Sequence, residues 1–180
     1  MTQLLSEILT PDLDLFSEAA LGNWHVLHTR SRQEKIVAAD LNAMQIGHFL
    51  PLVKRPRFYG RRKVMLEEPL FPSYVFVRGS QEDVYRIDRT KRVARIIPVA
   101  DQDKLCWELR NISMALAHNA PLDTYPMLRA GVRVLVKSGP LQGLEGLIQH
   151  RTSNRLVLQV EILGRAVSLE IDGSQLEVLD

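Results

Sequence analysis

Apolar and polar residues alternate with a period of two through the last third of the chain, in short runs that are typical of half-buried strands. The runs, in order, are Val132–Val136, 146–150, 156–162, 167–171 and 176–178. Gly, Pro and Asn residues separate them, and these residues favour turns. The pattern therefore predicts about five short strands that form a small antiparallel barrel over residues 129–180.

The first part of the chain mixes strand and helix patterns. Three segments rich in aromatic and β-branched residues are expected to be strands, namely 24–28, 70–77 and 95–99. Leu105, Leu109, Ile112 and Leu116 recur at helical spacing and predict an amphipathic helix that packs on a sheet. The fold class we expect is α+β, with an N-terminal antiparallel sheet and packed helices, a linker, and then the barrel.

A second helix is expected after Arg30. Ser31 and Glu34 have the spacing of a capping box, in which each side chain bonds a free backbone amide at the helix start. Ile36 or Val37, Leu41 and Met44 would share its buried face, and Gly47 would end it.

Residues 119–128 contain two prolines and no periodicity, so they are predicted to be a linker. The expected organisation is an acidic extension over residues 1–20, a first domain over 21–118, this linker, and a second domain over 129–180.

The formal net charge of +2 hides an uneven distribution. Residues 1–20 hold four acids and no bases, residues 21–100 hold fifteen bases and seven acids, and residues 101–180 hold eight bases and ten acids. A basic middle segment favours contact with nucleic acid, although a solvated basic surface gives the same count. The single cysteine, Cys106, and the absence of a secretory signal pattern favour the cytoplasm.

Three glycines in the segment 139–146 raise the possibility of a phosphate-binding loop. Their spacing matches neither the P-loop nor the dinucleotide fingerprint, and a strand follows them instead of a helix. The five histidines lack metal-ligand spacing, and no nucleophile motif is present. We therefore expect a protein that is not an enzyme and that has no metal and no cofactor.

The stretch 54–63 combines six bases with Phe58 and Tyr59, and Gly60 provides the turn of a hairpin. Such a hairpin could bind phosphates and stack an aromatic ring on a base, or its charges could protect an exposed sheet edge. Further bases lie at 86–95 and at the start of the first helix.

Leu70, Phe71, Tyr74 and Phe76 allow two interpretations. Phe71, Tyr74 and Phe76 cannot all point to one side of a regular strand. Either all are core residues, or some of them line an exposed apolar groove for the helices of a partner.

Three stretches together resemble the NusG family of transcription elongation factors. They are WHVLHTRSRQEK from Trp24, EPLFPSYVFV from Glu68, and the turn Gly139-Pro140-x-x-Gly143-x-x-Gly146 in a terminal barrel. The resemblance runs from about Trp24 to the end and implies an NGN domain followed by an SH3-like KOW barrel. The compact EPLFPSY segment and short basic hairpin look more like the specialised RfaH-type antiterminators than the general factor.

The resemblance implies a monomer whose NGN domain binds the clamp helices of the largest RNA polymerase subunit and suppresses pausing. The matching polymerase-binding positions are His28, Leu70, Phe71, Tyr74, Phe76, Thr90, Lys91 and Arg92. Specialised members also contact the non-template DNA strand. Here the available nucleic-acid-binding side chains are Arg30, Arg32, Gln33, Lys35, Lys54, Arg55, Arg57, Arg61, Arg62 and Lys63.

The KOW barrel of the family recruits either a small-subunit ribosomal protein or Rho. The implied contact positions are Gly139, Pro140, Leu141, Gly143 and Leu144. Some RfaH-type members fold this domain as a helical hairpin, but the alternation and the glycines favour the barrel here. A general NusG factor and a KOW-type RNA-binding or ribosome-associated protein stay open as alternatives.

Overall fold

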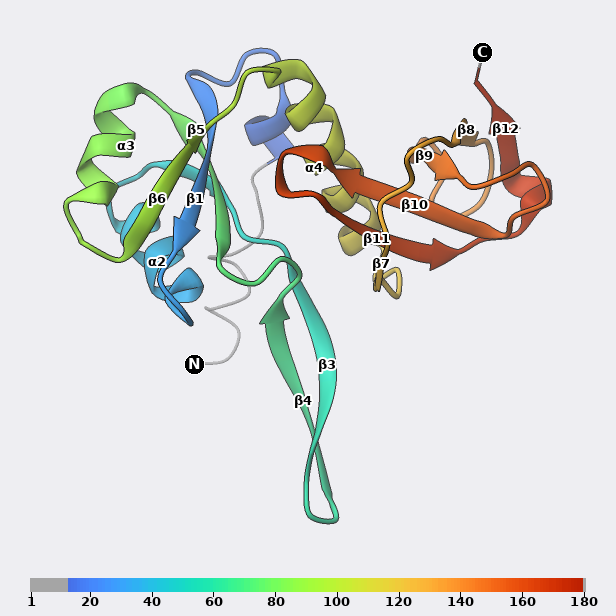
Figure 1. Ribbon diagram of the computed structural model, residues 1–180, viewed down its shortest axis with the longest axis horizontal. Helices are drawn as coiled ribbons and strands as arrows, with labels where there is room; N and C mark the ends of the chain where they lie inside the picture. Colours follow the sequence, from blue (N-terminus) through green and yellow to red (C-terminus); the bar gives the residue numbers. More distant parts are fainter. Residues whose placement is uncertain (1–12, 180) are drawn as a thin grey trace. The chain divides into compact units, whose positions relative to one another are not determined.

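The structure is a computed structural model that describes residues 13–179, and the chain divides into two compact units between Gln102 and Asp103. The predicted α+β class is confirmed: helices pack on an antiparallel sheet in the N-terminal unit, and strands dominate the C-terminal unit (Figure 1). None of the described helices is long and apolar enough to span a membrane.

The N-terminal unit is built on a four-stranded antiparallel sheet with the order β2-β5-β1-β6. Its strands are β1 (Asn23–Thr29), β2 (Gly47–Phe49), β5 (Tyr74–Gly79) and β6 (Val93–Pro98), and its helices are η1 (Leu13–Phe16), α2 (Glu34–Ala43) and α3 (Gln81–Asp88). The strands expected at 24–28 and 95–99 are present. The strand expected from Leu70 begins only at Tyr74, because a turn occupies the preceding residues.

One face of this sheet carries a hydrophobic core. Leu27 of β1 and Val75 and Val77 of β5 pack with Val37, Ala38 and Leu41 of α2 and Ile87 of α3. Residues at alternate positions of β1 and β5 must therefore lie on the other face, which we call the aromatic face.

The aromatic face holds Trp24 and Phe76, both buried. Phe16 stacks on Trp24 with ring centroids 5.6 Å apart and meets Phe49 edge-on at 5.4 Å. Phe16 belongs to the segment expected to be an acidic extension, so described residues of that segment contribute to the core. Residues 1–12 of the expected extension lie outside the described residues.

The predicted ends of α2 were wrong. Ser31 makes no capping box, since α2 begins after Gln33 without a side-chain cap, and Glu34 bonds the turn before β5 instead. The helix ends at Ala43, and Gln45, not Gly47, adopts the left-handed conformation after it, with φ of 57°. Val37 and Leu41 are buried as expected, and Ile36 is exposed.

Helix α3 was not predicted, although its start has a complete capping box. The Ser80 hydroxyl accepts from the backbone N–H of Asp83, and the Asp83 carboxylate accepts from the N–H of Ser80. The N–H and the hydroxyl of Ser80 both donate to the Asp83 carboxylate and hold the pKa of Asp83 below its usual range.

The basic stretch 54–63 lies in a two-stranded hairpin of β3 (Leu52–Tyr59) and β4 (Arg62–Pro69), as expected. Gly60 takes the left-handed conformation in the turn, with φ of 61°. The hairpin projects away from the sheet of its own unit (Figure 1).

The C-terminal unit contains an antiparallel sheet with the order β12-β8-β9-β10-β11-β7. Its elements are α4 (Gln102–Ala117), β7 (Asp123–Tyr125), β8 (Val132–Val136), β9 (Glu145–Ile148), β10 (Arg155–Val160), η2 (Glu161–Leu163), β11 (Arg165–Glu170), η3 (Gly173–Gln175) and β12 (Leu176–Val178). The expected strands are all present, and the expected amphipathic helix is α4. Leu105, Leu109 and Ile112 of its predicted stripe are buried.

Two features bear on the expected domain limits, which stay predictions. The segment expected as a linker contains β7, which pairs with β11. Helix α4 lies within the expected first domain; it begins at Gln102, and from Asp103 onward it belongs to the second unit. The limits at residues 20, 118 and 128 stay predictions.

Two histidines make the stability of the N-terminal unit depend on pH. Burial lowers the pKa of His25 and of His48 from the ordinary value of 6.5. The unfolded chain therefore binds more protons than the folded chain below this value, and we expect the free energy of unfolding to fall as pH decreases from 6.5. Urea titrations at a series of pH values measure it. The double variant His25→Gln/His48→Gln should have a flatter profile, and an equally steep profile would contradict the assignment.

Candidate functional site

His28 and Tyr74 form the exposed end of the aromatic face. They are directly opposed in the β1–β5 register, and their rings stack with centroids 5.1 Å apart. Both are half-buried. Arg95 of β6 is opposed to His28 from the other side and is exposed. These three side chains thus combine apolar ring surface with a cation, and we call them the His28 patch.

The turn before β5 positions Tyr74. The backbone N–H of Ser73 donates to Glu34 of α2 at 2.6 Å, and the N–H of Thr29 donates to the carbonyl of Ser73 at 2.8 Å. Ser73 has a φ of 70°, a conformation that costs free energy outside glycine and that these bonds help to hold. Glu34 was predicted only as a cap, so its positioning role was missed.

Three of the four residues that allowed either a core or a groove interpretation are buried. Leu70, Phe71 and Phe76 are 5%, 3% and 0% exposed. Phe71 folds back so that its ring meets Phe76 edge-on at 6.3 Å. These three side chains are therefore core residues. Of the predicted polymerase-binding positions on β1 and near β5, His28 and Tyr74 are the ones with exposed surface. The polymerase-binding role of the set stays a prediction.

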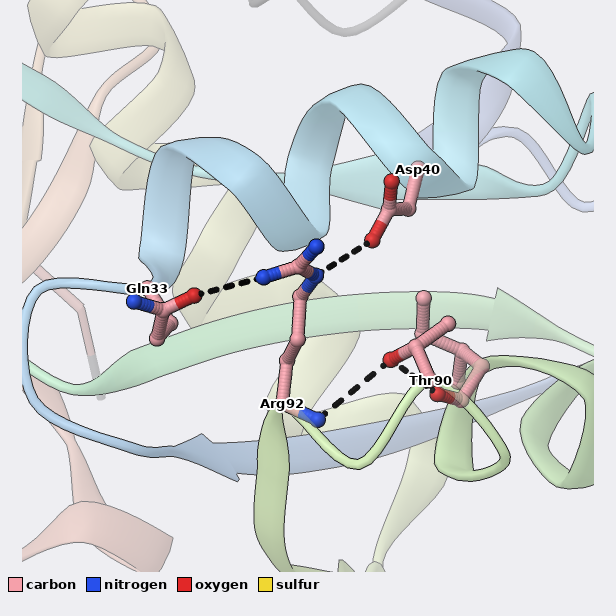
Figure 2. Close-up of polar contacts among 5 residues, drawn as sticks. Gln33, Asp40, Thr90 and Arg92 are labelled. Atoms are coloured by element: carbon pink, nitrogen blue, oxygen red, sulfur yellow. Dashed lines mark hydrogen bonds and ion pairs between the residues drawn. The ribbon is translucent and has the colours of Figure 1, made fainter.

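Thr90, Lys91 and Arg92 form the turn between α3 and β6. The Arg92 guanidinium donates to Asp40 of α2 and to Gln33, each at 3.1 Å (Figure 2). The Thr90 hydroxyl donates to the carbonyl of Ile87 at 2.7 Å. Arg92 thus fastens the turn to α2, and the exposed Lys91 is the cation that the turn presents.

The predicted nucleic-acid-binding residues lie on two neighbouring elements. Arg30, Arg32, Gln33 and Lys35 surround the start of α2, and the other six lie on the hairpin. The Lys35 ammonium donates to the backbone carbonyl of Glu67 on β4 at 2.7 Å, which joins the start of α2 to the base of the hairpin, where Lys54 is the register partner of Glu67. Arg57 is paired with Glu68 at 2.7 Å, and Gln33 is engaged by Arg92.

Over residues 13–179, no group of three His, Cys, Asp or Glu side chains is arranged to hold a metal ion.

The predicted partner loop of the C-terminal unit joins β8 to β9. Gly139 and Gly143 both have positive φ, 86° and 92°, which a side chain would disfavour. The N–H of Gly143 donates to the carbonyl of Val136, which closes the loop. Leu144 is fully buried and Leu141 is half-buried, so Leu141 is the leucine of the pair with exposed surface. The partner-binding role of Gly139, Pro140, Leu141, Gly143 and Leu144 stays a prediction.

Helix α4 fixes the end of this loop. The buried Asn111 side chain accepts from the N–H of Glu145 at 2.8 Å and donates to the carbonyl of Trp107 at 3.0 Å. The indole of Trp107 donates to Glu145, and the Arg133 guanidinium lies 5.4 Å from the ring centroid of Trp107. The first residue of β9 is therefore held by the helix, directly after Leu144.

We expect Asn111→Ala to release the start of β9. The substitution leaves the partly buried N–H of Glu145 without its acceptor, which costs about 1 kcal/mol or more. Hydrogen exchange followed by NMR should show faster exchange of the Glu145 amide, while Ala166 on β11 keeps its protection. Unchanged protection of the Glu145 amide would contradict the role given to Asn111.

The sequence matches a family model described as "Transcription termination factor nusG" over residues 22–113. It is 24% identical over 180 residues to the transcription termination/antitermination protein NusG of Rickettsia conorii, covering 91% of this chain and 94% of the relative. The corresponding protein of Borreliella burgdorferi is 25% identical over 183 residues, covering 86% and 97%. A solved structure of Thermotoga maritima NusG, titled for its domain interaction, is 24% identical with a TM-score of 0.41, covering 88% of this chain and 97% of that one.

Proposed function

The chain belongs to the NusG family, and from this premise we propose that its N-terminal unit binds RNA polymerase and suppresses pausing and termination. The chain is then a transcription termination/antitermination factor that acts by binding, without catalysis. The observation that carries the proposal is the His28 patch, where the stacked rings of His28 and Tyr74 are half-exposed at the end of a rigid sheet. Tyr and Arg are enriched among the few residues that dominate the free energy of binding at protein interfaces.

The basic surface supports a contact with nucleic acid in the same complex. Arg30 and Arg32 are exposed beside α2, and the hairpin carries further bases. The non-template DNA strand of the transcription bubble is the proposed ligand. Lys91, presented by the turn that Arg92 holds, is proposed to approach the opposite side of the polymerase cleft.

The C-terminal unit is proposed to be a KOW domain that recruits a second partner through Leu141. A small-subunit ribosomal protein or Rho is the candidate partner. Leu141 is half-exposed in a loop that is closed by the hydrogen bond from the Gly143 N–H to the Val136 carbonyl and tied down at Glu145 by Asn111. A preorganised loop of this kind loses little conformational entropy on binding.

A reconstituted transcription assay tests the proposal. Purified chain added to stalled or paused elongation complexes should shorten pauses and increase readthrough at terminators. No effect on either, with binding to polymerase also absent, would reject the function.

We further propose that the chain is a specialised, operon-specific paralogue; the short basic hairpin is the feature that favours this. The alternative is a general NusG factor that couples polymerase to Rho or to the ribosome. A genome-wide occupancy profile distinguishes them, because a specialised factor occupies few transcribed genes and a general one occupies most. A KOW-type RNA-binding or ribosome-associated protein would instead show no binding to purified polymerase.

A further inference from the structure

The register of the β3–β4 hairpin sorts its side chains onto two faces. Directly opposed residues of an antiparallel pair lie on the same side, and successive pairs alternate. The pairs Arg55–Leu66, Arg57–Val64 and Tyr59–Arg62 therefore share one side. We call Arg55, Arg57, Tyr59 and Arg62 the arginine face.

The opposite side has a different character. It consists of the pairs Lys54–Glu67, Pro56–Met65 and Phe58–Lys63. Its centre is apolar, with Phe58 and Met65 69% and 52% exposed. The two aromatic residues at the tip, Phe58 and Tyr59, thus lie on opposite faces although they are adjacent in sequence.

Tyr59 shares its side of the hairpin with three arginines. Arg62 is directly opposed to it, and Arg57 is the preceding same-face residue of its strand, about 7 Å away along the chain. Tyr59 is 64% exposed, so the ring is open to a ligand. We propose that the arginine face binds single-stranded nucleic acid, with Tyr59 stacked on an unpaired base and the three arginines on the flanking phosphates.

The aromatic ring distinguishes a single strand from a duplex. Within a duplex the faces of the bases are already stacked on one another, so Tyr59 would gain no contact there. In a single strand each base offers a free face, and stacking on an aromatic residue is a main source of affinity. Arginines alone would bind the phosphates of either form.

Glu68 lowers the net positive charge of the arginine face. It is the register partner of Val53 and lies on the same side as Arg57, whose guanidinium it binds through two nitrogens at 2.7 and 2.8 Å. The Arg57 side chain is 57% exposed. Exposed pairs of this kind add little stability, so a phosphate can displace Glu68 from Arg57.

This inference rests on the nucleic-acid contact of the proposed function and assigns it to one face of the hairpin. Its test uses no polymerase. A failure here therefore leaves the polymerase contact at the His28 patch standing, and the reverse also holds.

The experiment measures binding of the full chain to fluorescent oligonucleotides of about 16 nucleotides by anisotropy. The probes are oligo-dT, oligo-U and a DNA duplex of the same length, at about 50 mM salt. Tyr59→Ala is expected to weaken single-strand binding by about five-fold or more. Phe58→Ala is the matched control, since it removes an equally exposed ring from the other face and should change the affinity less than about two-fold.

A second pair of variants tests the charge. Glu68→Gln should strengthen single-strand binding, because it removes the acid from the arginine face, while Glu67→Gln on the other face should not. Each arginine of the face replaced by glutamine should lower the slope of log K against log salt by about 0.7.

Three results would overturn the proposal. They are a loss on Phe58→Ala equal to or larger than that on Tyr59→Ala, a duplex bound more tightly than the single strands, and no measurable binding by the unaltered chain. Equal affinities for oligo-dT and oligo-U would indicate that the arginine face binds the bases and phosphates that DNA and RNA share. A higher affinity for one of them would identify that nucleic acid as the natural ligand. Equal affinities and a preference for one oligonucleotide both support the assignment of the arginine face to single strands.

Discussion

Tyr74→Asp is expected to weaken binding to RNA polymerase by at least about 30-fold. Tyr74 is half-buried and stacks on His28, so its ring is both rigid and accessible. An aspartate removes the ring and introduces a charge that a partner would have to desolvate, which is unfavourable at the centre of an interface. Affinity capture of purified polymerase on the immobilised full chain measures the effect.

Tyr85→Asp provides the matched control for this result. Tyr85 lies on α3, is 56% exposed and contacts Arg89, with the guanidinium 5.9 Å from the ring centroid. The same substitution there should leave polymerase binding within about two-fold. Equal losses for the two variants, with both proteins folded by circular dichroism, would show that the His28 patch is not the contact. Phe71 and Phe76 are unsuitable for this test, because polar residues in their buried positions would disrupt the core.

Leu144→Ala is expected to lower the free energy of unfolding of the C-terminal unit by about 2–5 kcal/mol. Leu144 is fully buried between the partner loop and β9, so truncation leaves a cavity. Leu141→Ala, three residues earlier and half-exposed, should cost less than about 1 kcal/mol. Urea denaturation followed by the fluorescence of Trp107, in a Trp24→Phe background, reports on this unit.

The two leucines also separate stability from partner binding. Leu141→Ala should weaken capture of a ribosomal protein or Rho while the unit stays folded. A Leu144→Ala protein as stable as the unaltered chain would contradict the burial assigned to Leu144. Partner capture unaffected by Leu141→Ala would remove the loop from the proposed interface.

The periodicity of apolar residues predicted the elements in which that periodicity is clear, both strands and one helix. The strands β8–β12 followed from the alternation of residues 132–178, and α4 followed from the spacing of Leu105, Leu109 and Ile112. Helix α3 escaped because it is short and largely polar, with only Val84 and Ile87 buried. Its Ser80–Asp83 capping box was the signal that could have found it.

The candidate site was predicted less well, because local sequence does not reveal tertiary bonds. Glu34 has the spacing of a cap to Ser31, yet it bonds Ser73, 39 residues away. Arg92 was predicted from the sequence only as a polymerase-binding position, and its guanidinium donates to Asp40 and Gln33. Burial of Phe71 depends on the turn at Ser73, whose positive φ no sequence pattern indicates.

The division of the hairpin into two faces needed the register as well. The residues 54–63 suggested one basic projection, and only the pairing of Tyr59 with Arg62 assigns the tyrosine to the arginines and Phe58 to the other side. A shift of one residue would exchange the two sides.

The central claim, that the N-terminal unit binds RNA polymerase through the His28 patch, is tested most directly by site-specific crosslinking. A photoreactive phenylalanine derivative is placed at position 74 of the full chain, and in a second protein at position 85, and each is added to purified elongation complexes. We expect a crosslink from position 74 to the largest polymerase subunit, which unlabelled chain competes away, and none from position 85. No crosslink from position 74, or equal crosslinks from both positions, would contradict the claim.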